Sequence, residues 1–357
     1  MQEKYFAASN SAEGFKNYFG DIFKRADFIY IIKGGPGTGK SYFMLKQARL
    51  AEERGARVEY YYCSSDPTSV DGILVHDNAR KVAIVDGTSP HVSEPKYPGA
   101  YDEIINLGEF WNRELLIKQK NEIIALSDRK SAEYKNAYTF LRSVGNLCAV
   151  SDSLVSEAVE FDKMRAAASR ILNQNTIVDR GEASLIPAIT DSISMNGRVR
   201  FNTFESRAKK LYFVADAYGV GRMFLDCVFS LLKGFRVTAR ISYDPICPRH
   251  VDGIYIEDND VAFVLCDGSD DIMRIESEDL QTTDQPTVIN VRRFINVEKL
   301  RENRSEIRYT AHLAQNSLDG ALHALAKAKI YHFLLEDVYG KAMNWRKKDE
   351  FEKTFVL

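Results

Sequence analysis

The sequence predicts an α/β protein with two tandem domains, each a mostly parallel sheet with flanking helices and a long helical extension. Three observations favour this fold class: the length of 357 residues, short motifs repeated about 180 residues apart, and a glycine-rich loop between a strand pattern and a helix pattern. At about 150 residues per domain, the length alone suggests two domains. We place them at residues 1–178 and 179–357.

The two halves carry the same short motifs in the same order. The matched positions are Gly39 with Gly221, Asp66 with Asp244, Asp71 with Asp252, and Asp86 with Asp267. Their separations are 182, 178, 181 and 181 residues, nearly constant over about fifty positions. Similarity at a fixed spacing indicates a repeated structural unit, so we interpret the chain as a tandem duplication.

Composition limits the classes of function. The net charge of −2 gives no global reason to bind nucleic acid or an anionic membrane, and 45% hydrophobic residues exclude wholesale disorder. No apolar run approaches the ~18–20 residues of a membrane span, and no signal peptide is evident. The five cysteines form no Cys-x-x-Cys pair, which fits a reducing compartment. We expect a cytoplasmic protein without membrane or nucleic-acid partners; a Cys63–His91 nucleophile stays open.

The glycine-rich loop runs from Gly34 to Ser41 and reads Gly-Gly-Pro-Gly-Thr-Gly-Lys-Ser, which fits the pattern G-x-x-x-x-G-K-[ST]. A buried-strand pattern at 28–32 precedes it, and a helix pattern from Ser41 to Arg54 follows it. Glycines allow backbone amides to point inward at phosphate oxygens, and the helix N-terminus adds partial positive charge. Lys40 is expected to bridge the β- and γ-phosphates, and the Ser41 hydroxyl to hold Mg²⁺.

On this motif the chain resembles the P-loop NTPase superfamily. The whole arrangement also resembles a little-characterised bacterial family of duplicated P-loop proteins, through the loop and the stretches at 86–91 and 98–108. The resemblance implies nucleotide binding, with ATP and Mg²⁺ as the cofactors. The loop residues that it assigns to the nucleotide are Gly35, Pro36, Gly37, Thr38, Gly39, Lys40, Ser41 and Tyr42.

Acidic residues at the ends of two predicted strands complete the expected site. Asp86 ends an apolar run at 82–85, like the Walker B strand, and is expected to be the second Mg²⁺ ligand with Ser41. Alternatively, Asp86 only opens the turn before Gly87. Many P-loop ATPases have a glutamate where Gly87 stands, so we expect slow hydrolysis.

Other groups could substitute for the missing glutamate. Asp66 follows a probable strand, and we take Lys40, Asp86 and Asp66 as the catalytic candidates. Asp66 could instead form a turn before Pro67. His91 and Glu94 could also reach the γ-phosphate, although a histidine in this loop could simply lie at the surface.

The second copy has lost the key side chains of the loop. Arg222 stands for Lys40, Met223 for Ser41, and Asp216 would lie near the phosphates and repel them. Methionine offers no hard oxygen ligand to Mg²⁺. We therefore expect one active site per chain, in the first half; the alternative is that Arg222 still holds a phosphate.

Two further patterns concern the architecture. The apolar segments 73–76 and 82–85 are too close for a parallel crossover, which predicts an antiparallel hairpin and a mixed sheet in each half. Residues 102–173 contain no proline and show helical spacing, as does 297–345. These helical extensions either cover the domains or form an arm for a protein partner or a homo-oligomer.

The leading functional prediction is a Mg²⁺-dependent ATP-binding protein, a slow ATPase whose nucleotide state drives a conformational change. One alternative is a small-molecule or nucleotide kinase, with Asp66 engaging the acceptor and Lys96 and Arg113 as lid residues. Another is a nucleotide-gated scaffold with little or no hydrolysis. The chain lacks an Asn-Lys-x-Asp motif for guanine, which favours ATP. The basic residues after Lys120 alternate with acids and predict a solvated helix face.

Overall fold

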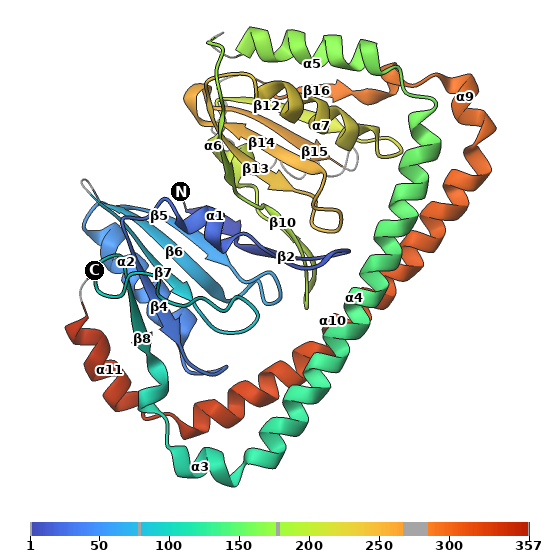
Figure 1. Ribbon diagram of the computed structural model, residues 1–357. Helices are drawn as coiled ribbons and strands as arrows, with labels where there is room; N and C mark the ends of the chain where they lie inside the picture. The colour runs from blue at the N-terminus through green and yellow to red at the C-terminus, as the bar shows by residue number, and fades with distance from the viewer. Residues whose placement is uncertain (1, 78–79, 176–178, 267–284, 356) are drawn as a thin grey trace.

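The computed structural model describes residues 2–77, 80–175, 179–266, 285–355 and 357. It is an α/β structure with two six-stranded sheets, as predicted (Figure 1). The first sheet has the order β1-β5-β6-β7-β4-β8. Its strands are β1 (Glu3–Phe6), β5 (Arg57–Tyr62), β6 (Val70–Asp77), β7 (Arg80–Asp86), β4 (Phe28–Lys33) and β8 (Asp102–Asn106). Only β6 runs antiparallel to its neighbours, which confirms the predicted mixed sheet.

The second sheet repeats this topology strand for strand. Its order is β16-β12-β15-β14-β13-β9. The strands are β16 (Thr287–Asn290), β12 (Lys210–Ala215), β15 (Val261–Cys266), β14 (Val251–Ile256), β13 (Thr238–Tyr243) and β9 (Ser184–Pro187). The repeat in the sequence is therefore matched by a repeat in the topology. The landmark Asp267 and residues 176–178 at the predicted boundary lie outside the described residues.

Two small hairpins and two short helices lie between the sheets. They are β2 (Ala8–Ser11) with β3 (Gly14–Asn17), β10 (Asp191–Ser194) with β11 (Gly197–Arg200), α1 (Phe19–Phe23) and α6 (Thr203–Arg207). A shared apolar core joins both halves here, with Phe6 and Phe23 from the first and Phe204 and Phe213 from the second. Aromatic rings fill this core because each sheet presents the alternate side chains of its strands to the other half.

A helix from the same half of the sequence packs on the outer face of each sheet. These are α2 (Lys40–Glu53) and α7 (Val220–Leu232). Helix α2 buries Phe43, Met44, Ala48 and Ala51, the spacing of one helical face, against β5, β6 and β7. It begins after Gly39, whose φ of 79° is a left-handed conformation that glycine adopts without strain.

The helical extensions form two long helices that run side by side in opposite directions (Figure 1). The first extension contains α3 (Arg113–Lys118), α4 (Lys120–Ser156) and α5 (Phe161–Asn175); the second contains α9 (Val297–Glu302), α10 (Arg304–Ala342) and α11 (Trp345–Thr354). Leu141 of α4 and Leu325 of α10 share one apolar cluster, and Leu126 and Leu335 share another. None of the helices in the described ranges combines the length and apolar character required to cross a bilayer.

The terminal helices are exchanged between the halves. Helix α5, from the first half, packs its Met164 and Leu172 into the core around α7 of the second. Helix α11, from the second half, places Phe351 against the first core, and Phe355 directly after the helix packs there too, with its ring centroid 5.1 Å from that of Phe43. The division at 178/179 thus describes the repeat in the sequence, whereas each packed unit takes its last helix from the other half.

Candidate functional site

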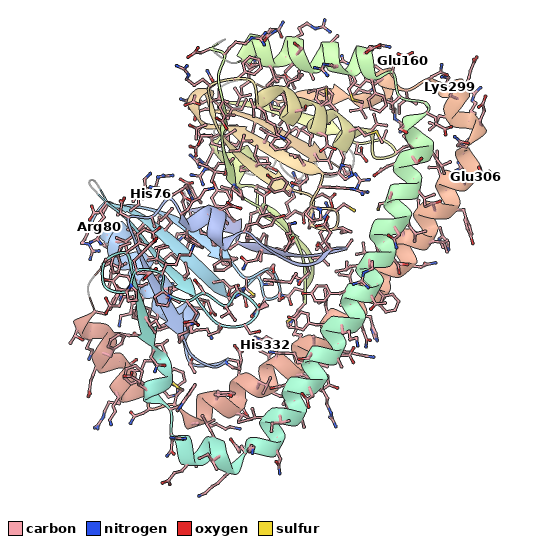
Figure 2. The ribbon with its side chains drawn as sticks, in the orientation of Figure 1. His76, Arg80, Glu160, Lys299, Glu306 and His332 are labelled. Atoms are coloured by element: carbon pink, nitrogen blue, oxygen red, sulfur yellow. The ribbon has the colours of Figure 1, made fainter. Side chains whose placement is uncertain are left out.

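The candidate site is a cavity of about 1040 Å³ between the first sheet and the two long helices. Its floor is the glycine-rich loop after β4 together with the ends of β5 and β7, and its other wall is one face of α4 with part of α10. His332 is labelled in Figure 2 on the stretch of α10 that passes this opening. Residues from both sequence halves therefore line one cavity.

The glycine-rich loop holds its lysine inside its own curve. Lys40 Nζ donates to the carbonyl oxygens of Gly34 at 3.2 Å and Gly35 at 2.9 Å, and lies 3.6 Å from Asp86 Oδ2. Gly37 has a φ of 67°, which favours glycine. The buried Thr38 hydroxyl donates to the Gly35 carbonyl at 2.8 Å and closes the loop.

Most of the residues assigned to the nucleotide face this cavity. Seven of the eight line it, namely Pro36, Gly37, Thr38, Gly39, Lys40, Ser41 and Tyr42. Gly35 does not; a side chain there would meet the ring of Tyr339 on α10. Ser41 Oγ accepts a hydrogen bond from the Val70 amide at 2.9 Å. Tyr42 lies at the rim and is 63% exposed.

Asp86 and Asp66 each combine a turn contact with a place on the cavity wall. Asp86 is buried; its Oδ1 accepts from the amide and hydroxyl of Thr88, while its Oδ2 faces Lys40. The turn and site interpretations of Asp86 are thus geometrically compatible. Asp66 Oδ1 accepts from the amide and hydroxyl of Thr68, at 3.1 and 2.7 Å, and the residue also lines the cavity.

A buried cluster beside Lys40 includes one residue that the sequence reasoning did not single out as functional. Asp71, Asp86 and His91 place one ligand-type atom each within 4.8 Å of one another. Burial and the neighbouring Asp86 carboxylate raise the pKa of Asp71 to about 8. Asp71 is one of the positions shared by the two halves, where it matches Asp252. This match was the sequence signal that pointed to it.

His91 is buried, so the alternative interpretation of it as a surface loop histidine was wrong. Its side chain is 5% exposed, and its ring stacks on Phe19 with the centroids 4.7 Å apart. Burial lowers the pKa of His91. Glu94 instead pairs with Lys33 at 2.6 Å. Burial raises the pKa of the Cys63 thiol well above its usual value, which argues against a Cys63 nucleophile.

Helix α4 supplies cations that the sequence reasoning assigned to solvent. Lys130, Lys135 and Arg142 line the cavity. Lys130 is half-buried, and burial together with the charge of Lys40 lowers its pKa. For Lys130 the predicted solvated helix face was therefore wrong. Burial and the charge of Lys130 in turn lower the pKa of His332 to about 4. The expected lid residues Lys96 and Arg113 do not line the cavity.

Helices from the second half lie directly on the glycine-rich loop. A Cβ atom on Gly37 would collide with the backbone carbonyl of Glu336 on α10. A Cβ atom on Gly39 would lie 3.2 Å from the ring of Trp345 and 2.9 Å from Lys348 on α11. The loop therefore requires glycine for packing against these helices as well as for its own turn.

The corresponding loop of the second half is filled by its own carboxylate. Asp216 accepts hydrogen bonds from the amides of Gly219 at 3.1 Å and Gly221 at 2.6 Å. Arg222, at the position of Lys40, pairs with Asp152 of α4 at 3.2 Å and with Asp244 at 3.7 Å. An anion thus already occupies this ring of amides.

The site combines a glycine-rich loop, two neighbouring lysines and buried carboxylates in one cavity. Such a set of groups suits a polyanionic ligand bound with a cation. No family model, curated protein or solved structure matches the chain.

Proposed function

We propose that the chain binds ATP with Mg²⁺ at residues 35–42 of the first half and hydrolyses it slowly, so that nucleotide state moves α10. One observation carries the proposal. Asp216 fills the amide ring of the second loop, and the position that matches Asp216 in the first half is Gly34. The same fold therefore takes an internal anion in one copy and has no side chain at that place in the other, which supports an external anion there.

Charge in the cavity favours a polyphosphate over a single carboxylate. Lys40 and Lys130 approach the same space from opposite walls, and their mutual repulsion lowers the pKa of Lys130 in addition to burial. Among the described residues Lys130 makes no hydrogen bond or ion pair, and Glu336 acts on its charge only at longer range. A bound triphosphate places negative charge between the two lysines, and such charge-assisted contacts are worth about 1.5–3 kcal/mol each.

The residues present fit a magnesium ion at this loop. Ser41 Oγ and the Asp86 carboxylate are hard oxygen donors on the cavity wall, the ligand type that Mg²⁺ takes. When bound, Mg²⁺ neutralises phosphate charge. Lys40 would leave the carbonyls of Gly34 and Gly35 for the phosphate oxygens, where it stabilises charge that develops during phosphoryl transfer. Gly87 offers no side chain to orient water, which favours a slow reaction.

The contacts of α10 supply a route from nucleotide to conformation. Its Glu336 backbone lies against Gly37, at the tip of the loop that would enclose the phosphates. The helix continues for about 30 residues from there to the second unit, beside α4. A change at the loop tip therefore acts on a rigid element that belongs to both units.

Titration calorimetry with a non-hydrolysable ATP analogue and Mg²⁺ tests the binding proposal. We expect one nucleotide per chain, and none for Lys40→Ala with an unchanged circular dichroism spectrum. Phosphate release without any acceptor tests hydrolysis. No measurable affinity for any nucleoside triphosphate, or full affinity in Lys40→Ala, would refute the site.

A kinase is the second candidate, because the cavity is large. At about 1040 Å³ it reaches the upper end of the ~300–1,000 Å³ of small-molecule pockets, and its α4 wall extends from Ser127 to Arg142. Lys135 and Arg142 at the far end suit an anionic acceptor. ADP formed only after a metabolite extract is added would favour the kinase over the ATPase.

A further inference from the structure

We propose that Asp71, Asp86 and His91 form a binding site for a divalent transition-metal ion, of which Mn²⁺ is the probe, and that this ion binds without nucleotide. The three side chains come together because β6 and β7 are antiparallel. The start of β6, at Asp71, therefore lies beside the end of β7, at Asp86, and His91 returns from the loop that follows β7.

The spacing of the three side chains is close to that of ligands around one ion. Their ligand-type atoms lie within 4.8 Å of one another, and His91 Nε2 is 3.4 Å from Asp71 Oδ2. Atoms bound to one ion at about 2.1 Å are roughly 3–4 Å apart, so small side-chain movements suffice. All three residues are less than 8% exposed, which limits competition from water.

The histidine is held in place without the partners of a structural histidine. Its Nδ1 atom is buried and has no hydrogen-bond partner. Stacking on Phe19 fixes the plane of the ring and leaves Nε2 facing Asp71. Buried polar atoms are normally hydrogen-bonded, so the unpartnered Nδ1 shows that ring packing rather than a hydrogen bond holds this imidazole, with Nε2 directed at the two carboxylates.

The second half places a fixed cation near the counterpart of Asp71. That counterpart, Asp252, is within range of the charge of the half-buried Arg200, which itself pairs with Glu205 at 3.1 Å. The two hairpins have the same register, which makes Asn17 the counterpart of Arg200. The first half thus has an uncharged amide where the second has a guanidinium.

The donor set selects the class of metal. Mg²⁺ and Ca²⁺ prefer oxygen ligands alone, whereas imidazole with carboxylates suits ions such as Mn²⁺, Fe²⁺, Co²⁺ or Zn²⁺. Asp86 has two oxygens and can serve both this ion and the Mg²⁺ proposed with the nucleotide. Paired ions in such sites lie about 3.5–4 Å apart.

Metal binding without nucleotide tests the proposal separately from ATP binding. The full chain is titrated with Mn²⁺ alone, and free Mn²⁺ is followed by electron paramagnetic resonance. We expect one bound ion, with a nitrogen hyperfine coupling in pulsed spectra that reports the His91 ring. Mg²⁺ should displace Mn²⁺ only at a large excess.

Two variants and one control complete the test. His91→Gln is expected to weaken Mn²⁺ binding roughly tenfold or more and to remove the nitrogen coupling, and Asp71→Asn to weaken binding similarly. His312→Gln, which changes an exposed histidine of α10 outside the cavity, is expected to retain both. Circular dichroism and melting establish that each variant is folded. Absence of Mn²⁺ binding to the wild type, or an unchanged nitrogen coupling in folded His91→Gln, would overturn the proposal whether or not ATP binds.

Discussion

Glu59 of the first sheet and Arg240 of the second form a bidentate ion pair between the two units. Arg240 donates from Nη1 to Glu59 Oε2 at 3.0 Å and from Nη2 to Glu59 Oε1 at 2.8 Å, and both side chains are almost completely buried. Burial alone would raise the pKa of Glu59, but Arg240, His76 and Arg25 hold it well below its usual range. The ion pair therefore links the two units, because the buried Glu59 carboxylate of one unit is kept ionised by the Arg240 guanidinium of the other.

Arg240→Met is expected to destabilise the chain by about 3–5 kcal/mol, because it leaves the Glu59 carboxylate buried with fewer partners. Urea unfolding, followed by far-ultraviolet circular dichroism, measures the change. Combining it with Glu59→Gln should recover part of the loss. Lys163→Met, which removes an exposed pair with Glu160, is the control and should cost under about 0.5 kcal/mol. If Arg240→Met and the control Lys163→Met destabilised the chain equally, burial of the Glu59–Arg240 pair would not matter for stability.

Transferring the internal anion of the second loop to the first tests why only one loop is expected to bind nucleotide. Gly34→Asp with Thr38→Val copies the pair Asp216 and Val220, two side chains that the second loop accommodates together. We expect at least a hundredfold loss of Mg-ATP affinity in calorimetry, since the carboxylate competes for the loop amides and repels phosphate.

Gly20→Asp is the matched control for that variant. It adds the same charge at a position where a Cβ atom meets nothing within 4 Å, and nucleotide affinity should not change. Retained affinity in the double variant would mean that the loop amides are not the phosphate site.

The sequence predicted best those features that residues close together along the chain determine. The loop from Gly34 to Ser41, the strand before it and the helix after it could be predicted, because the turn needs glycine at fixed positions. The antiparallel hairpin of β6 and β7 followed from a connection too short for a crossover. These features are local, so one stretch of sequence determines them.

The parts that could not be predicted depend on contacts between distant segments. Lys130 has the spacing of a solvent-facing residue on α4, and only the position of α4 over the loop buries it. The exchange of α5 and α11 is equally hidden, because each helix is amphipathic and could cover either sheet. His91 is buried beside Phe19 of α1 and Phe15 of β3, two rings that lie more than 70 residues before it in the sequence.

Removing the second cation of the cavity is expected to have opposite effects with and without nucleotide. Lys130→Met relieves repulsion from Lys40 and should raise the melting temperature of the free protein by one or two degrees. It should also weaken Mg-ATP binding by roughly 10- to 100-fold, and Mg-ADP binding less, if Lys130 contacts the terminal phosphate. Calorimetry with both nucleotides measures this. Lys120→Met, at the exposed start of the same helix, should change neither property.

The free energy of unfolding is expected to fall with rising pH because of His250, which lies between Asp152 of α4 and Asp226 of the second unit. Hydrogen bonds to Asp152 and then Asp226 raise the pKa of His250 to about 9, from 6.5 in the unfolded chain. Since the folded pKa is the higher one, protonated His250 stabilises fully below about pH 6.5, and this contribution is lost as pH rises through about 9. The stability difference between wild type and His250→Gln, measured by urea unfolding, should shrink over that interval. A constant difference from pH 6 to pH 9.5 would contradict the assignment.

The exchange of terminal helices can be tested, because α11 should stabilise the unit on which it packs rather than the half of the sequence that encodes it. Phe351→Ala with Phe355→Ala removes one ring of α11 and the ring just after it from the core around Phe43, and each partly buried ring should contribute about 2 kcal/mol. Hydrogen exchange, read by mass spectrometry, should accelerate in β4 and β5 of the first half and remain slow in β12 and β13 of the second. Phe161→Ala, a half-exposed ring at the start of α5, serves as the control. Faster exchange confined to the second half would mean that α11 packs on the half that encodes it. Acceleration limited to the first sheet would instead support the exchange, because the sequence alone places these rings more than 280 residues from the strands they protect.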